Sequence, residues 1–320
     1  MWEVLDTAKS VVEESQNVWI DIEALISFSQ KLFEDGIGVP QWRCPYHFYD
    51  GTEDTVSYIL VLDSMNFCFW PPSGKDKWEI DYESKRLSGY YGLAASLKQA
   101  VESGIPITKA EYLAELTLVK LEHILGGKGE LQLMEDRLKI LRELGCVLLE
   151  GYGGKASSLV KSAEKSALKL VRLIAEKLPS FRDVSEYQDR KIFFYKRAQI
   201  FAADLYGAFN GKDWGSFADI GELTAFADYK LPQVLRHLGI LCYSQPLAQK
   251  VDQKIQLEGG SPEEVEIRAN TIWAVELIRK ELDRMGRKFK AFEIDWMLWN
   301  MGQDDEFRLK PYHRTVTIFY

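Results

Sequence analysis

One carboxylate near the end of this 320-residue chain has an unusually apolar neighbourhood. Asp295 lies in the segment AFEIDWMLWN, residues 291–300, next to Trp296 and one helical turn before Trp299. Burying a carboxylate is costly unless it is paired, hydrogen-bonded or protonated. A fixed carboxylate beside aromatic walls suits a reaction in which positive charge develops next to a flat ring. The structural alternative is a helix N-cap that lies beside core tryptophans.

The local sequence predicts where this carboxylate lies on its helix. The preceding helix begins with Ser261 as its N-cap and Pro262 in its first turn. The segment RKFKAFEIDWMLWNMG then indicates a short loop and a further helix. We expect Asp295 at or near the N-terminus of that helix, where the helix dipole favours the ionised form. Trp299 shares a face of the helix with Asp295 because the two are four residues apart.

A second group of polar residues occurs in DIGELTAFADYKLPQVLRHLGILCYS, residues 219–244. Thr224 can cap a short helix that contains Phe226, and Pro232 suits the first turn of the next helix. The corner between these helices consists of Asp228, Tyr229 and Lys230. Backbone N–H groups that open a helix favour anions or polar ligand atoms. The structural alternative is that Asp228 is simply the N-cap of the second helix.

A third group lies in FFYKRAQIFAADLYGAF, residues 193–209, which has an apolar stripe and further apolar surface, so we expect a helix buried on most sides. Lys196 and Gln199 share one face, and Arg197 and Asp204 share another. One interpretation is a cationic face turned to an anionic ligand. The other is an Arg–Asp pair at the margin of the core with a lysine whose ammonium group reaches solvent.

The elements that must position these residues are mostly helices. Helical periodicity extends over residues 10–36, 109–127, 130–152 and 157–181. Strand signals are few and predict a hairpin over residues 77–92 and a strand over 314–320. The sequence therefore predicts a mainly α fold with a minor β element. We expect one compact domain over residues 1–320, with a possible subdomain junction, or simply a loop, at the glycine-rich stretch near residue 153.

Composition narrows the class of function. The formal net charge is −8, whereas proteins that hold a nucleic-acid backbone are normally basic. Long DNA or RNA is therefore not the expected ligand, although a nucleotide needs only a few local cations. The four cysteines form no C-x-x-C pair and match neither a zinc site nor a disulfide framework. No signal peptide or membrane-spanning run is apparent, so we expect a cytoplasmic protein without a membrane partner.

Several blocks of the sequence together resemble the queuosine salvage family. They are VSYILVLDSMNFCFWP, GYYGLAASLKQA, FYKRAQIFAADL, FADYKLPQVLRHLG, EIRANTIWAVELI, IDWMLWN and HRTVTIFY, in this order from about residue 40 onward. The resemblance implies a helical glycosylase-like fold. It also implies hydrolysis of the N-glycosidic bond of queuosine 5′-phosphate, which releases the base queuine for reuse in tRNA, with no metal or other cofactor.

The resemblance also gives the candidate residues their roles. Breaking a ribose–base bond passes through an oxocarbenium-like state, which Asp295 would stabilise while it activates water. Asp228 would accept hydrogen bonds from the guanine-like edge of the base. The residues expected to hold the 5′-phosphate are Lys196, Arg197 and Lys230, and those expected to form stacking walls are Phe226, Tyr229, Trp296 and Trp299.

Two alternatives remain open from the sequence. A weaker resemblance connects the chain to helix-hairpin-helix DNA glycosylases, in which a helix–turn–helix corner precedes a catalytic aspartate with an aromatic residue four positions later. The acidic charge and the lack of a clearly placed Schiff-base lysine disfavour DNA lyase chemistry. The other alternative is a non-catalytic protein that binds a nucleotide or a queuosine-like ligand.

Overall fold

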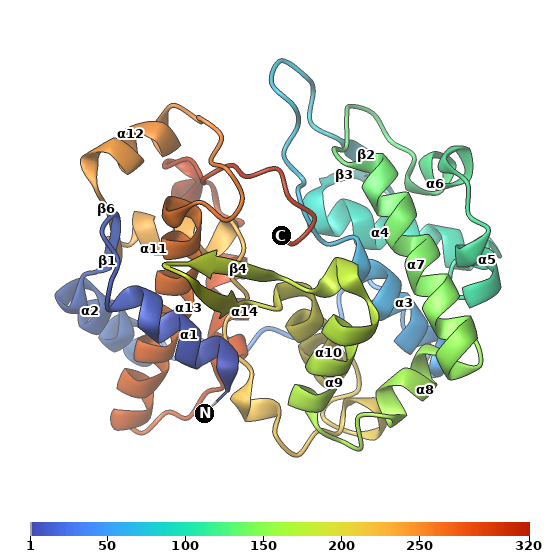
Figure 1. Cartoon of the computed structure of the whole chain (residues 1–320), viewed down its shortest axis with the longest axis horizontal. Coiled ribbons are helices and arrows are strands. Elements are labelled where there is room, and N and C mark those ends of the chain that lie inside the picture. Colours follow the sequence, from blue (N-terminus) through green and yellow to red (C-terminus); the bar gives the residue numbers. More distant parts are fainter. Residues whose placement is uncertain (1) are drawn as a thin grey trace.

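A computed structural model describes residues 2–320 of the chain (Figure 1). This part of the chain is mainly helical and contains fourteen α-helices and three two-stranded antiparallel sheets, as the sequence predicts. Helices α3 to α8 gather on one side of the view in Figure 1, and α11 to α14 gather on the other with α1 and α2. The 3₁₀ helices are η1 (Pro179–Phe181), η2 (Asp213–Gly215), η3 (Ile220–Glu222) and η4 (Asp305–Arg308).

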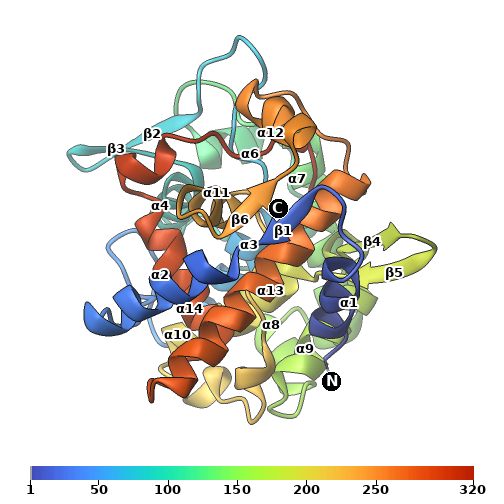
Figure 2. The ribbon, with the colours of Figure 1, turned by 90° about the vertical axis from the view of Figure 1, so that its left-hand side faces the viewer.

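The N-terminal elements pack against the longest helix of the C-terminal half. They are α1 (Glu3–Val12), β1 (Val18–Ile20) and α2 (Ile22–Glu34). Figure 2 shows α1 and α2 on either side of α13 (Pro262–Arg284), and both helices contact it. The β1 strand interrupts the helical pattern expected over residues 10–36 and pairs with β6 (Leu241–Tyr243). Its three residues, Val-Trp-Ile, are the β-branched and aromatic types that strands favour.

The next segment forms the hairpin that the sequence predicts. Its elements are α3 (Glu53–Ser64), β2 (Glu79–Tyr82), β3 (Lys85–Ser88) and α4 (Gly89–Glu102). The two strands pair from Glu79 with Ser88 to Tyr82 with Lys85, which lies within the predicted 77–92 range. Helix α4 follows directly and packs against both strands and α3.

Two helical patterns of the sequence are each broken into two helices. The five helices of this region are α5 (Ala110–Ala114), α6 (Leu118–Leu125), α7 (Met134–Tyr152), α8 (Ala156–Lys161) and α9 (Ala167–Lys177). Thr117 begins α6 by accepting a hydrogen bond from the amide of Lys120, and Ser166 begins α9 in the same way. Glu164 and Lys165 between α8 and α9 have positive φ angles, which end a helix. Near residue 153, Gly153 ends α7, and α8 packs back against α7.

The helix that carries the third polar group is buried as predicted. A hairpin of β4 (Val184–Tyr187) and β5 (Arg190–Phe193) leads into α10 (Lys196–Ala208). Eleven of the thirteen α10 residues are buried, and the helix packs against α3 and α9. A helix enclosed in this way can place side chains rigidly because its neighbours fix their rotamers.

The remaining elements are α11 (Lys230–His237), α12 (Gln245–Asp252), α13 and α14 (Ala291–Met301). The strand predicted over residues 314–320 is wrong, because only Arg314 forms an isolated bridge, with Gln256. Tyr320 is instead fixed by its side chain, whose hydroxyl donates to Glu264 Oε1 at 2.8 Å, and by its carbonyl, which accepts from the amide of Cys68 at 3.0 Å.

Among the helices within residues 2–320, none combines the length and the apolar composition that crossing a bilayer requires.

Candidate active site

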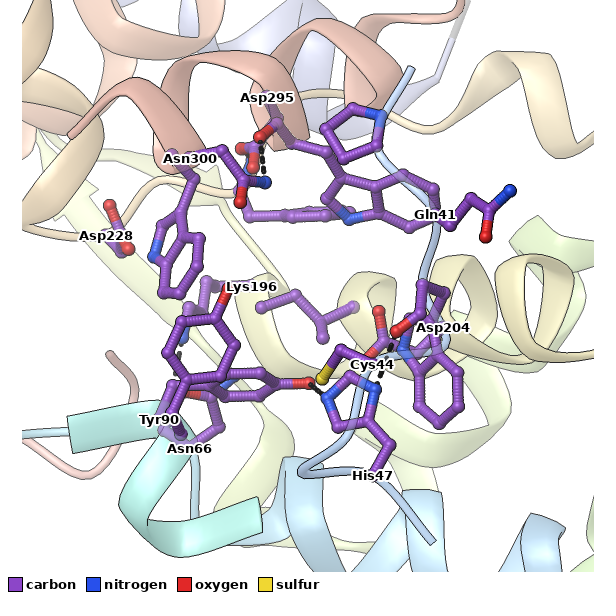
Figure 3. A pocket seen from close by; sticks show the side chains of 17 residues that line it. Gln41, Cys44, His47, Asn66, Tyr90, Lys196, Asp204, Asp228, Asp295 and Asn300 are labelled. Atoms are coloured by element: carbon purple, nitrogen blue, oxygen red, sulfur yellow. Dashed lines mark hydrogen bonds between the residues drawn. The ribbon is translucent and has the colours of Figure 1, made fainter. Parts of the chain in front are cut away.

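A small cavity lies where α4, α10 and α14 meet the loop between α2 and α3 (Figure 3). Asp204, Asp228 and Asp295 all line it. The structure therefore brings together carboxylates from three distant parts of the sequence. Figure 3 shows Asp295 on one side of the enclosed space, and Lys196 and Asp204, both from α10, on the other side. The walls are largely aromatic and include Trp42, Tyr90, Tyr91, Phe226, Trp296 and Trp299.

Asp295 lies deeper in its helix than the sequence indicates. Lys290 is the N-cap of α14, and Glu293 completes its capping box. Asp295 is thus the fifth residue of α14, in its second turn, which is near the helix N-terminus but not at it. Its side chain is 3% exposed and accepts a hydrogen bond from the amide of Phe226 at 2.7 Å. Burial, aided by the charge of Asp228, raises the pKa of Asp295 well above its ordinary value, contrary to the expected preference for the ionised form.

The segment before the corner is irregular and not the short helix that was predicted. Residues 223–228 form no helix or strand. Thr224 does not cap one, because its amide donates to Gln199 Oε1 at 3.0 Å and its hydroxyl accepts from Gln199 Nε2 at 3.1 Å. These bonds between Thr224 and Gln199 fix segment 223–228 against α10. The amide of Phe226 in this segment donates to Asp295.

The two oxygens of the Asp228 carboxylate have different surroundings. Its Oδ1 accepts from the amides of Lys230 at 2.8 Å and Leu231 at 2.9 Å, so it caps the first turn of α11. Residues 2–320 donate no hydrogen bond to its Oδ2, and Asp228 lines the cavity. Burial raises the pKa of Asp228, whereas the charge of Lys196 and the two amides lower it. One oxygen is thus structural, and the other is available to a ligand.

Lys196 faces the carboxylates from α10. Its ammonium group donates to the carbonyl of Asn66 at 2.8 Å. Burial lowers the pKa of Lys196 to about 8, and the charges of Asp228, Asp63 and Asp295 oppose this shift. The side chain is 3% exposed and lines the cavity as predicted.

Arg197 points away from the cavity. Its guanidinium donates to the carbonyls of Ser64 and Ser180 and lies 4.5 Å from the centre of the Phe181 ring. It lines neither this cavity nor the larger one next to it. The prediction that Arg197 faces an anionic ligand is therefore wrong. The reason is helical geometry, since the next residue points about 100° away from Lys196 around the helix.

Asp204 is a site residue that the sequence interpretation missed. It follows Lys196 and Ile200 at intervals of four residues, and all three line the cavity. The spacing is visible in the sequence, but the sequence interpretation paired Asp204 with Arg197 instead. Burial raises the pKa of Asp204 to about 7, although the Trp42 indole and the charge of Lys196 favour its ionised form.

His47 supports this wall of the cavity. Its Nδ1 lies 2.7 Å from the carbonyl of Trp42, its Nε2 lies 2.9 Å from the hydroxyl of Tyr90, and its ring stacks on that of Trp42 at 4.1 Å. Burial lowers the pKa of His47 to about 4, so the ring is neutral at pH 7. A neutral ring that bonds a carbonyl through Nδ1 carries its proton there, so Nε2 accepts from Tyr90.

The predicted stacking residues separate into two groups. Phe226, Trp296 and Trp299 line the small cavity. Trp299 meets the rings of Tyr90 and Tyr91 edge to face at 5.7 and 5.4 Å. Tyr229 lines only the larger cavity and packs against Tyr312, with ring centres 4.8 Å apart.

The larger cavity has a volume of about 500 Å³ and adjoins the small one, with Lys196, Asp228 and Trp299 on the shared wall. Lys230 lines it but not the small cavity. Its other cationic residues, which the sequence interpretation did not single out, are Lys77, Lys254, Arg308 and Arg314. This cavity is therefore rich in positive charge, in contrast to the acidic small cavity and to the acidic chain as a whole.

Comparison with known proteins agrees with the resemblance noted in the sequence. Residues 46–320 match the family described as queuosine salvage protein. A protein of Sphaerobacter thermophilus, named queuosine 5′-phosphate N-glycosylase/hydrolase, is 48% identical over 317 residues, which cover 99% of this chain and 97% of the relative. Proteins with the same name are 37% identical in Bos taurus, over 98% of both chains, and 40% identical in Dictyostelium discoideum, over 84% of this chain and 79% of the relative. The chain belongs to the queuosine salvage protein family.

Proposed function

We propose that this protein hydrolyses the N-glycosidic bond of queuosine 5′-phosphate and releases queuine. The observation that carries the proposal is the buried carboxylate of Asp295, held by the Phe226 amide in an aromatic-walled cavity. The names of the relatives support the same reaction for a homologous site. Queuine is a 7-deazaguanine with a protonated secondary amine and a cyclopentene diol.

The reaction requires stabilisation of positive charge at the ribose. As the bond between C1′ and the base breaks, charge develops at C1′ and the ring oxygen, and ionised Asp295 offsets it. Asp295 then takes a proton from the attacking water, whose oxygen bonds to C1′. The departing base takes up one proton from solvent, and Asp295 returns its proton to solvent, so that one water is added across the bond. The products are queuine and ribose 5-phosphate, so one water is consumed for each bond broken.

Substrate binding helps Asp295 to ionise. In the free protein, burial and the charge of Asp228 raise its pKa. A bound ligand with a cationic amine brings positive charge into a cavity lined by three carboxylates and one ammonium group. An opposite charge nearby favours the ionised form of a carboxyl group. A cationic ligand therefore favours the charged form of Asp295 that this chemistry uses.

The other carboxylates recognise the base. Asp228 Oδ2 accepts from the guanine-like edge while Oδ1 remains engaged with α11. Asp204, on the other side of the cavity from Asp295, accepts from the amine, because a buried carboxylate that lines the cavity suits a cationic donor. Phe226, Trp296 and Trp299 stack on or enclose the base.

Incubation with queuosine 5′-phosphate and detection of free queuine by mass spectrometry test the proposal. The wild-type protein should release queuine, and Asp295→Asn should release far less. Tight binding with unchanged ligand would instead identify a non-catalytic binding protein. A duplex-binding assay at low salt addresses the DNA-glycosylase alternative, which the acidic charge disfavours.

A further inference from the structure

We propose that Lys77, Lys230 and Arg308 form an anion subsite in the larger cavity and that this subsite holds the 5′-phosphate of the substrate. The inference rests on the proposed function for the identity of the ligand. Its physical basis is a group of cations that three separate segments bring together beside the small cavity.

The three cations come from different parts of the fold. Lys77 precedes β2, Lys230 is the first residue of α11, and Arg308 is the last residue of η4. All three line the larger cavity. Burial lowers the pKa of Lys230 to about 8, and the charges of Arg308 and Lys77 add to the effect. Burial lowers the pKa of Lys77 as well, the charge of Glu79 opposes this shift, and the charge of Arg308 adds to it. Like charges held together in this way are relieved when a dianion binds between them.

These cations are not committed to strong ion pairs. Within residues 2–320, no carboxylate lies within 4 Å of the ammonium group of Lys77 or Lys230. Lys230 donates only to the neutral amide oxygen of Gln233, at 3.1 Å. Arg308 bonds Asp305 at 3.1 Å, but Asp305 is 97% exposed, and such a surface pair contributes little.

Two buried arginines elsewhere in the protein differ from this group because their donors are bonded within the protein. Arg268 is paired with Asp183 through two hydrogen bonds of 2.9 and 2.6 Å, and Arg137 donates to the carbonyls of Met65, Phe67 and Cys68. Their donors are used within the protein. The donors of Lys77 and Lys230 remain available, as in a binding site.

Lys196 lies on the wall that the two cavities share, but its surroundings suit a phosphate less well than those of the other cations. Lys196 donates to a backbone carbonyl and faces Asp228, Asp63 and Asp295. A phosphate dianion placed there would be repelled by these carboxylates. Asp228 and Trp299 lie on the wall that the two cavities share, so a ligand whose base bonds Asp228 lies next to the cationic cavity, and we place its phosphate there.

The N-terminus of α11 does not supply the subsite either. The amides of Lys230 and Leu231, which open the helix, already donate to Asp228 Oδ1. The expectation that these amides bind the anion is therefore wrong. The side chain of Lys230 is what the helix contributes, and Gly302 leaves room for it, because a Cβ there would lie 2.9 Å from Lys230 Cδ.

The experiment compares two substrates on single variants. Lys77→Ala, Arg308→Ala and Lys230→Met are each assayed with queuosine 5′-phosphate and with unphosphorylated queuosine. Each variant should lower kcat/KM for the phosphate roughly ten- to hundred-fold, because a charge-assisted hydrogen bond is lost. With the nucleoside the change should stay within about two- to three-fold. Lys75→Ala is the matched control, since Lys75 is exposed, pairs with Glu130 at 3.4 Å and does not line this cavity.

A binding measurement separates this inference from the proposed function. Inorganic phosphate is titrated into the wild-type protein and the three variants, with tryptophan fluorescence as the signal, since Trp70 and Trp299 line the cavity. Weaker phosphate binding in the variants supports the subsite even if the wild-type protein releases no queuine. Equal losses of activity on both substrates, or unchanged phosphate binding in all three variants, would overturn the subsite even if queuine is released.

Discussion

The carboxylate of Asp295 and the backbone amide of Phe226, 69 residues apart in the sequence, are joined by a 2.7 Å hydrogen bond. This bond fixes the candidate catalytic group of α14 to the irregular segment 223–228. The same segment continues into Asp228, whose Oδ1 opens α11. The candidate groups for catalysis and for base recognition are therefore mutually positioned through the backbone and not only through side-chain packing.

We expect Asp295→Asn to fold and bind substrate but to lose activity. The amide oxygen of asparagine can still accept from Phe226, but it carries no charge to stabilise the oxocarbenium-like state. The turnover rate should fall by a factor of ~10²–10³, while the thermal midpoint and the Kd for queuosine 5′-phosphate stay close to those of the wild-type protein. Asp283→Asn, at an exposed carboxylate on α13, is the control. Turnover within a few-fold of the wild-type rate would remove Asp295 from the catalytic role.

Asp228→Asn should distinguish the roles of the two oxygens of this side chain. The asparagine Oδ1 can still accept from the amides of Lys230 and Leu231, because asparagine caps helices about as well as aspartate. Its Nδ2, however, would face the N–H donors of the base, a mismatch of about 1–3 kcal/mol when buried. Thermal melts and substrate Kd measured on the same sample check this. Unchanged stability together with unchanged affinity would leave Asp228 only its structural role.

The affinity for the cationic substrate should weaken below about pH 7. Burial raises the pKa of Asp204 to about 7, so the free protein holds a proton there in acid. Binding of the amine favours the ionised form and must then release that proton, which costs affinity as the pH falls. Asp204→Asn should reduce this pH dependence and lower the affinity above pH 7. An analogue without the amine, 7-deazaguanosine 5′-phosphate, should respond to neither change, and an equal response would contradict the assignment.

Lys196→Met should stabilise the fold at neutral pH. Burial lowers the pKa of Lys196 from 10.5 to about 8, so the unfolded chain binds more protons between these values. The charged lysine therefore costs stability below pH 8, by at most about 3 kcal/mol, and this cost disappears as the pH rises toward 10.5. Urea unfolding of both proteins from pH 7 to pH 10 measures the difference. A stability difference that does not shrink with rising pH would contradict the prediction.

Regular helices and hairpins follow closely from the sequence. The mainly α fold, the hairpin over 77–92 and the buried helix α10 could all be predicted because periodicity and turn residues are local signals. Segment 223–228 could not, because its conformation depends on the side chain of Gln199, which is distant in sequence. Residues 314–320 look like a strand but are held by contacts to Glu264 and Cys68.

In the candidate site too, some residues follow from local sequence signals, whereas others are placed only by contacts distant in sequence. Lys196, Asp228, Asp295, Trp296 and Trp299 all reach the small cavity, as the motifs indicate. Arg197 and Asp204 were assigned to each other because they share a helix face, but each has a different environment once α3 packs against α10. Lys77 and Arg308 carried no local signal, since only the three-dimensional fold brings them beside Lys230.

The walls of the small cavity have a consequence for how the protein is made. Trp42 comes from an early loop, whereas Asp295 and Trp299 come from α14. A ribosome must therefore translate and release nearly 300 residues before these walls can meet. Asp204 and Asp228 are therefore translated well before Asp295. We expect the ability to bind a nucleotide to arise late and abruptly during synthesis, with no partly active nascent form.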